Sequence, residues 1–140
     1  MKRKCIIRAA MIVGFVGLSI GGWAATKVQG QSASTGISIP SGQPVTFLQF
    51  ISEGEGSTSR FRFLTPGIGA DLEYEDVFDD FQALCDEQVM PAIIQNSLHP
   101  QQIVLSMSAV DIPFGGDDPA VLQFFEVFRP ENGRCIWEEF

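Results

Sequence analysis

The chain has 140 residues, of which 45% are hydrophobic and 19% are charged, a composition typical of one globular domain with a sizeable core. Its formal net charge is −8, and four of its nine basic residues lie in the first eight positions. The rest of the chain carries five basic against 17 acidic residues, and such a surface repels phosphate backbones and anionic lipid headgroups. This charge argues against nucleic acid or a membrane surface as a partner of the folded domain.

The start of the chain has the layout of an export signal. A basic beginning is followed by residues 9–22 (AAMIVGFVGLSIGG), which carry no charge, and small side chains permit cleavage after Ala24 or after Gly30. We therefore expect residues 1–30 to be a signal peptide and the mature protein to be periplasmic or secreted. The alternative is an uncleaved anchor in the inner membrane with the domain facing the periplasm, because residues 9–26 approach the length of a spanning helix.

Export determines how the cysteines are interpreted. Cys85 and Cys135 are the two cysteines beyond the signal, and in an oxidising compartment they most simply form one disulfide. A redox pair or a pair of metal ligands is the alternative, but the chain contains no CxxC motif. The sequence therefore predicts a structural disulfide.

The domain is predicted to begin after a flexible lead-in. Residues 31–43 (QSASTGISIPSGQ) have no apolar period, which places a single domain at residues 44–140. Two β-branched and aromatic stretches, residues 44–52 and 59–65, flank a polar loop with two glycines. This arrangement is typical of a β-hairpin.

A long helix is predicted over residues 74–97, because apolar side chains recur on one arc of a 3.6-residue wheel and acids occupy the other arc. Cys85 falls on the apolar arc, so the disulfide would attach the C-terminal strand to the buried side of the helix. Pro91 cannot donate to the carbonyl of Glu87, which predicts a kink or a division of the helix near Met90.

Three further strands are predicted at residues 102–112, 121–129 and 134–140. For residues 118–124 a helix is the competing interpretation, because Asp followed by Pro is a good helix start. The resulting order is β-β-α-β-β-β. It predicts a single α+β domain, with a mainly antiparallel five-stranded sheet and one long helix packed on one face.

Several short motifs support a resemblance to known proteins. They are Leu84-Cys85 with Pro91 on the helix, the loop Pro113-Phe114-Gly115, and the C-terminal runs Phe125–Arg129 and Gly133–Glu138. Over most of residues 40–140 the chain resembles an uncharacterised family of small exported proteobacterial proteins. The resemblance implies export and supplies no activity, ligand or site.

Catalytic chemistry has few candidates. His99 is the only histidine and no GxSxG motif occurs, so we expect no nucleophilic triad, no zinc site and no cofactor. Asp111, Asp117 and Asp118 bracket a Gly-rich loop, which makes them candidates for calcium binding or for a carboxylate-dependent periplasmic hydrolase. The competing interpretation is a solvated turn in which Asp118 is a helix or turn cap.

Two charged groups are candidates for binding. The acidic arc of the helix is a predicted docking strip for a basic partner, and it comprises Asp76, Asp79, Asp80, Asp86 and Glu87. Arg60 and Arg62 lie on one face of a predicted strand, where they would clamp a carboxylate ligand or pair with neighbours such as Glu126.

These features favour a non-catalytic exported module that binds an envelope protein or a small ligand. The alternatives are the hydrolase or calcium-binding domain that would use the three loop aspartates, and a structural component of the envelope. A deep pocket that converges on those aspartates would favour the enzyme, whereas a flat acidic or apolar patch would favour the binding module.

Overall fold

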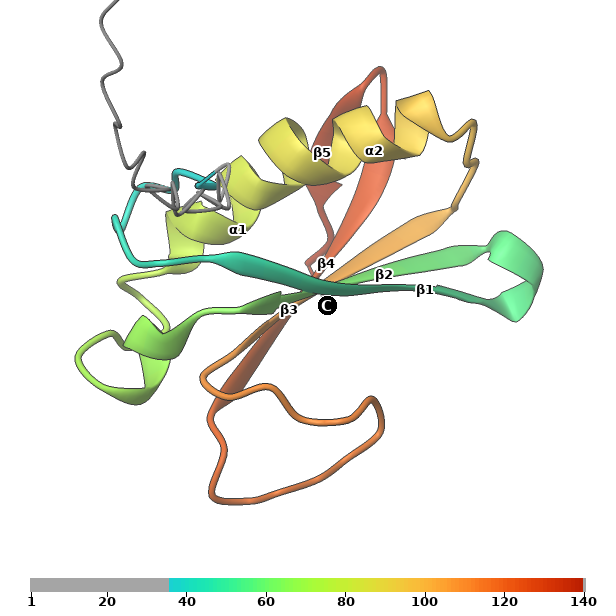
Figure 1. The fold of residues 1–140 in the computed structure, drawn as a ribbon. Helices are drawn as coiled ribbons and strands as arrows, with labels where there is room; N and C mark the ends of the chain where they lie inside the picture. The colour runs from blue at the N-terminus through green and yellow to red at the C-terminus, as the bar shows by residue number, and fades with distance from the viewer. Residues whose placement is uncertain (1–35, 140) are drawn as a thin grey trace, which may run out of the picture. The chain divides into compact units, whose positions relative to one another are not determined.

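The computed structural model describes residues 36–139, so the predicted signal peptide, its cleavage sites and the alternative anchor lie outside the described residues. The strands are β1 (Thr46–Glu53), β2 (Thr58–Leu64), β3 (Gln102–Ser108), β4 (Gln123–Glu131) and β5 (Arg134–Trp137). The main helical segments are α1 (Phe78–Leu84), η3 (Cys85–Val89) and α2 (Met90–Gln95), and two short turns of helix are η1 (Gly54–Gly56) and η2 (Pro66–Gly69). The predicted order β-β-α-β-β-β is confirmed (Figure 1).

The strands form one sheet in the order β1-β2-β3-β4-β5. Three pairings are antiparallel, as predicted, but β2 and β3 run parallel. The long connection through the helix allows this pairing, because a crossover returns the chain to the end of the sheet from which β2 started. The sheet is therefore mixed, with β3 at its centre.

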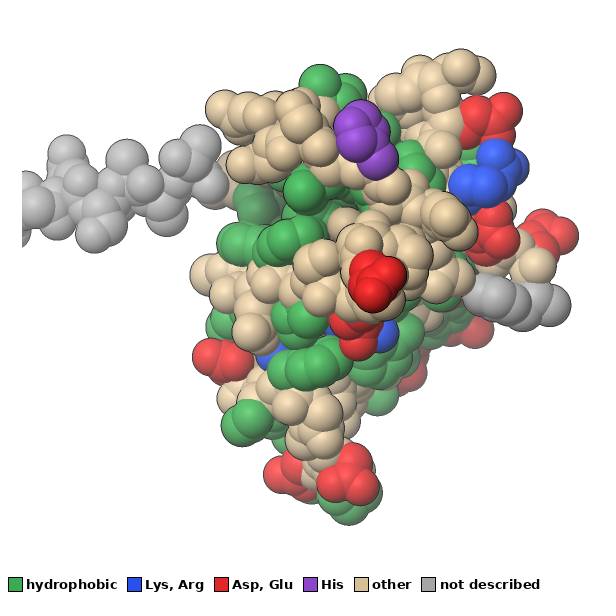
Figure 2. Space-filling model, turned by 90° about the vertical axis from the view of Figure 1, so that its right-hand side faces the viewer, with side chains coloured by type: hydrophobic (Ala, Val, Ile, Leu, Met, Phe, Trp, Pro, Cys, Tyr) green, Lys and Arg blue, Asp and Glu red, His purple; other side chains and the backbone are tan. Residues whose placement is uncertain are grey.

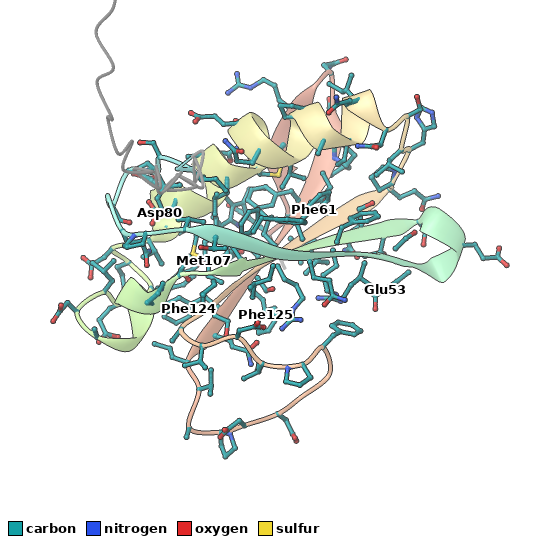
Figure 3. The ribbon with its side chains drawn as sticks, viewed as in Figure 1. Glu53, Phe61, Asp80, Met107, Phe124 and Phe125 are labelled. Atoms are coloured by element: carbon teal, nitrogen blue, oxygen red, sulfur yellow. A yellow bond between two sulfur atoms is a disulfide. The ribbon has the colours of Figure 1, made fainter. Side chains whose placement is uncertain are left out.

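The core lies between the sheet and the helix. Side chains alternate along each strand, so every second residue faces the helix, and we call this side of the sheet the helix face. Its largest buried hydrophobic residues are Phe61, Phe63, Ile103, Leu105, Met107 and Phe128. Phe81, Leu84 and Val89 of the helical segment are buried against them, and Figure 3 shows Phe61 between sheet and helix. Each such side chain contributes about 1.5–3 kcal/mol when it is fully buried.

The helix begins at Phe78, later than predicted. Before it the chain makes tight turns, in which the backbone N–H of Val77 donates to the Tyr74 carbonyl. The carboxylate of Asp76 accepts a hydrogen bond from the backbone N–H of Glu73 at 3.0 Å. An acidic side chain that bonds to the backbone in this way competes with helix formation, which explains the late start.

Pro91 changes the type of helix without separating it into two. Residues 85–89 form a π-helical turn, in which the backbone N–H of Met90 donates to the carbonyl of Cys85 five positions earlier. The wider turn accommodates Pro91, which has no N–H for the carbonyl of Glu87. The predicted division near Met90 is therefore wrong: the irregularity is a change of helix type over residues 85–89, and Figure 1 shows one coiled ribbon through α1 and α2. Within residues 36–139 none of the helices combines the length and apolarity that crossing a membrane requires.

The predicted disulfide is present. Cys85 and Cys135 are bonded, with their Cα atoms 5.9 Å apart, and both side chains are buried. Trp137, on the same face of β5, stacks on Phe78 with ring centroids 4.4 Å apart. The helix is therefore attached to the outer strand β5 by a covalent bond and by aromatic packing.

Two segments outside the regular elements differ from their predicted structure. Packing extends into the described end of the predicted lead-in, because Ile39 and Gln43 are buried. At residues 118–124 the helical interpretation is wrong. Asp118 makes a turn in which its carboxylate accepts from the Ala120 N–H at 2.9 Å, and strand β4 then begins at Gln123.

Tyr74, the only tyrosine, closes one end of the core. Its ring packs edge-on against Phe78 and Phe124, with centroids 6.0 and 5.5 Å away. Its hydroxyl donates a hydrogen bond to Glu126. Burial first, then the hydrogen bond and the negative charge of Glu126, raise the pKa of Tyr74 to about 12.

Removal of the disulfide is expected to destabilise the domain strongly. The bond joins residues 50 positions apart, and closing a loop of that length contributes about 4 kcal/mol through the entropy of the unfolded chain. We expect the double variant Cys85→Ala, Cys135→Ala to lose about this free energy of unfolding in urea titrations. Wild-type chain unfolded with dithiothreitol present should match the double variant. An unfolding curve that is insensitive to reductant would contradict this expectation.

The Tyr74 titration should distinguish the folded from the unfolded chain. Near-ultraviolet absorbance of the phenolate should give a midpoint near 12 in the native chain and near 10 in urea. Because the folded pKa is the higher one, this group's stabilisation is complete below about pH 10 and is lost as the pH rises toward 12. Glu126→Gln should lower the native midpoint, and Glu138→Gln should leave it unchanged. A native midpoint equal to the urea value would show that Tyr74 is not held as described.

Candidate functional site

The sheet face opposite the helix carries a hollow beneath the loop of residues 109–122. Figure 1 shows this loop on the side of the sheet away from the helix, and Figure 3 shows Phe125 pointing toward it. The hollow measures about 230 Å³. We call it the arginine pocket, and its principal lining residues are Arg60, Arg62, Ser106, Phe114, Gln123 and Phe125.

Neighbouring residues on strands β2, β3 and β4 form the floor of the pocket. Arg62 on β2 lies beside Ser106 on β3, which in turn lies beside Phe125 on β4. The loop supplies Phe114, whose ring centroid is 5.5 Å from Cζ of Arg60 and 6.0 Å from Cζ of Arg62. A guanidinium at this distance is attracted to the face of an aromatic ring. The predicted proximity of the two arginines on one strand face is therefore confirmed, and an aromatic wall is added to it.

The two arginines have different partners. Arg60 forms an ion pair with Glu53, with Nη2 and Oε2 2.9 Å apart. Arg62 donates instead to two neutral oxygens, Oε1 of Gln49 at 3.0 Å and the backbone carbonyl of Ile112 at 2.6 Å. The Arg62 residue is only 7% exposed.

Arg62 is unusual among the arginines of this acidic domain. Residues 36–139 contain 17 acidic residues and four arginines, and the other three arginines each lie within 4.0 Å of a carboxylate. Within this described range no carboxylate lies that close to Arg62. A guanidinium whose hydrogen-bond acceptors are all neutral lacks a counter-charge in direct contact, and burial of a charge without such a partner is costly.

Glu126 does not pair with these arginines, contrary to the prediction. It lies beside Leu105 in the sheet register, and both residues face the helix. Its carboxylate accepts the hydrogen bond of Tyr74 there. Strand alternation places Arg60 and Arg62 on the opposite face, so the sheet itself separates the charges.

The three loop aspartates do not form a site together. Asp111, Asp117 and Asp118 are exposed, and the Asp118 carboxylate accepts from the N–H of Ala120. In the part of the chain that the structure describes, no group of three or more His, Cys, Asp or Glu side chains is arranged to hold a metal ion. The calcium and hydrolase interpretations therefore gain no support from the geometry.

The predicted acidic strip divides into exposed and engaged carboxylates. Asp76, Asp79 and Glu87 are exposed. Asp80 is fully buried, at 0% exposure, so its predicted place on the surface is wrong. Asp86 is partly buried, and it accepts from the backbone N–H of Cys135 at 2.8 Å.

Asp80 holds the described start of the chain against the helix. Its Oδ1 accepts from the Ser41 N–H at 2.8 Å, and its Oδ2 accepts from Nε2 of Gln43 at 3.2 Å. These hydrogen bonds satisfy a buried carboxylate, which explains why an acid is tolerated there. Figure 3 shows Asp80 between the helix and this segment.

His99 lies at an open groove between the end of the helix and the β4–β5 turn. The groove measures about 520 Å³, and Ser97 and Glu131 also line it. The carboxylate of Glu131 is engaged by Arg129, which donates a hydrogen bond to it.

The two arginines were predicted as a binding group, and the groups that surround them were not. The loop of residues 109–122, which has no apolar period, supplies the ring of Phe114 and the carbonyl of Ile112. The neighbouring strand β1 supplies Gln49. The Pro113-Phe114-Gly115 motif was the available signal, because an aromatic residue in a Gly-rich loop is well placed to cover a charged group.

Replacement of Asp80 should loosen the segment around residues 36–45. Asp80→Asn keeps one oxygen but presents an amide N–H₂ to a second donor, so a buried hydrogen bond is lost at a cost of about 1–3 kcal/mol. Hydrogen exchange should accelerate at Ser41 and its neighbours, and urea unfolding should report the loss. The exposed neighbour provides the control, because Asp79→Asn should change stability by less than about 0.5 kcal/mol. Equal effects at both positions would contradict the assigned role of Asp80.

Comparison with known proteins places the chain in a family. No curated protein and no solved structure is significantly similar to it. Residues 19–140 match a family of unknown function, DUF6497, and this match spans most of the chain. The resemblance to an uncharacterised family is therefore confirmed, and the chain belongs to DUF6497, a family of unknown function.

Proposed function

We propose that this chain is an exported, non-catalytic binding module whose arginine pocket takes a small ligand that carries a carboxylate beside an apolar or aromatic group. The observation that supports the proposal most directly is the buried guanidinium of Arg62, which meets only neutral acceptors within residues 36–139. A ligand carboxylate would supply the missing negative charge.

The chemistry of the pocket matches such a ligand. A guanidinium has five N–H donors in a planar fork that fits a carboxylate, and Arg62 uses two of its nitrogens on neutral oxygens. Phe114 and Phe125 are each about half exposed and offer apolar walls. Ser106 and Gln123 add polar groups that would orient the ligand. A few convergent polar groups within apolar walls are typical of small-molecule sites.

Export is part of the proposal. The charge-free stretch after a basic start is typical of a signal peptide, and a buried disulfide forms and persists in oxidising compartments. We infer a periplasmic or secreted location on these two grounds. A protein of the envelope is the corresponding partner class, and the exposed acids Asp76, Asp79 and Glu87 are the part of the acidic arc that we propose for docking a basic surface.

Nuclear magnetic resonance can test the pocket directly. We expect phenylacetate at millimolar concentration to shift the side-chain N–H signals of Arg60 and Arg62, because a new charge-assisted hydrogen bond forms at the guanidinium. Benzyl alcohol has the same ring without the charge and should shift them much less. Arg62→Gln should weaken phenylacetate binding at least about tenfold, since hydrogen bonds to charged groups contribute about 1.5–3 kcal/mol.

Arg134→Gln is the matched control, because Arg134 lies on the exposed surface. This variant should bind phenylacetate as the wild type does. If all four arginine signals respond equally, the interaction is a general charge effect and the proposed site is wrong. If neither compound shifts Arg62 while the chain is folded, the proposed function is wrong as well.

A further inference from the structure

The two edges of the sheet differ in a way that affects association. Strand β5 is short, and charged side chains lie along or beside it, among them Arg134 and Glu138. Strand β1 is twice as long, and its sequence TFLQFISE has one charge, Glu53, which already pairs with Arg60. Short, charged edges resist pairing with other chains, whereas long, neutral edges invite it.

An apolar groove runs beside β1 on the helix face. Phe47 and Phe50, which lie there, are 47% and 38% exposed. Between β1 and the helix lies a hollow of about 460 Å³, which Phe47, Phe50, Phe61, Ala92, Asn96 and Leu98 line. Figure 2 shows hydrophobic side chains gathered at the surface on this side of the molecule.

The groove continues toward the start of the helix. A second hollow of about 150 Å³ shares Phe47, Phe61 and Ala92 with the first and adds Ile37 and Val89. None of the residues that line either hollow is charged. An occupant must therefore present uncharged apolar side chains, and the open backbone of β1 favours an occupant in an extended conformation.

We propose that the occupant is strand β1 of a second copy of this chain, paired antiparallel about a twofold axis. The outer side of β1 carries no strand within residues 36–139. Two copies of so acidic a domain repel one another unless they meet through a neutral surface, and β1 with its groove is such a surface. The same strand supplies both the aromatic side chains and the groove that takes them, as a twofold interface requires.

Strand geometry is compatible with this pairing. The register of β1 against β2 shifts between Phe47 and Gln49, and from Gln49 to Glu53 the pairing is continuous. An antiparallel seam centred on Phe50 would bring the two Phe50 rings together on the helix face. It would also join the two sheets and place both arginine pockets on the opposite face. The dimer does not depend on ligand binding at those pockets.

Sedimentation velocity of the full chain without detergent tests the dimer. We expect a concentration-dependent dimer. Phe50→Lys should weaken dimerisation at least tenfold, because it places a charge at the interface between the two β1 strands. Ser52→Lys, at an exposed polar position of β1, should weaken it as well and removes no core contact. Ile136→Lys is the matched control, because Ile136 has the same 38% exposure as Phe50 on the opposite edge strand.

Thermal unfolding of each variant separates loss of the dimer from loss of the fold. If Phe50→Lys fails to fold, the effect of Ser52→Lys on dimerisation is the test of the proposal. A chain that is monomeric at every concentration would overturn the proposal. A dimer that survives both β1 substitutions, or one that Ile136→Lys dissociates, would show that another surface associates and would overturn it too.

Discussion

The packing of one helix against one face of the sheet, fixed by the bond between Cys85 and Cys135, determines where the remaining groups lie. Apolar side chains at alternate strand positions face the helix, so the residues between them face away from it. For Arg60 and Arg62 this means the opposite face, where the loop of residues 109–122 lies over them. The arginine pocket follows from the same alternation that builds the core.

Exposed aromatic residues lie at the other edge of the sheet. The disulfide attaches the helix at the β5 side of the sheet, and Phe47 and Phe50 on β1 are partly exposed. A single helix does not cover all five strands, so apolar surface stays exposed to solvent at one edge. A binding partner would bury that surface. Ligand binding and association are therefore proposed at two surfaces that the single helix leaves uncovered.

Periodicity predicted the elements and the disulfide because each is encoded in local patterns and in the small number of cysteines. It did not predict the parallel pairing of β2 with β3, since the choice of a neighbouring strand is not encoded in the period of either one. The wheel placed Asp80 with the exposed acids, but the segment around Ser41 covers it. The ring of Phe114 reaches Arg62 through a loop without a period, so this contact became visible only in the structure.

The central functional claim is that the charge of Arg62 is completed by a ligand carboxylate. A crystal structure of the chain grown with phenylacetate tests it most directly. We predict a carboxylate within hydrogen-bond distance of the Arg62 guanidinium, with the ring of the ligand against Phe114 or Phe125. Phenylacetate bound elsewhere, with Arg62 still held by Gln49 and Ile112 alone, would contradict the claim.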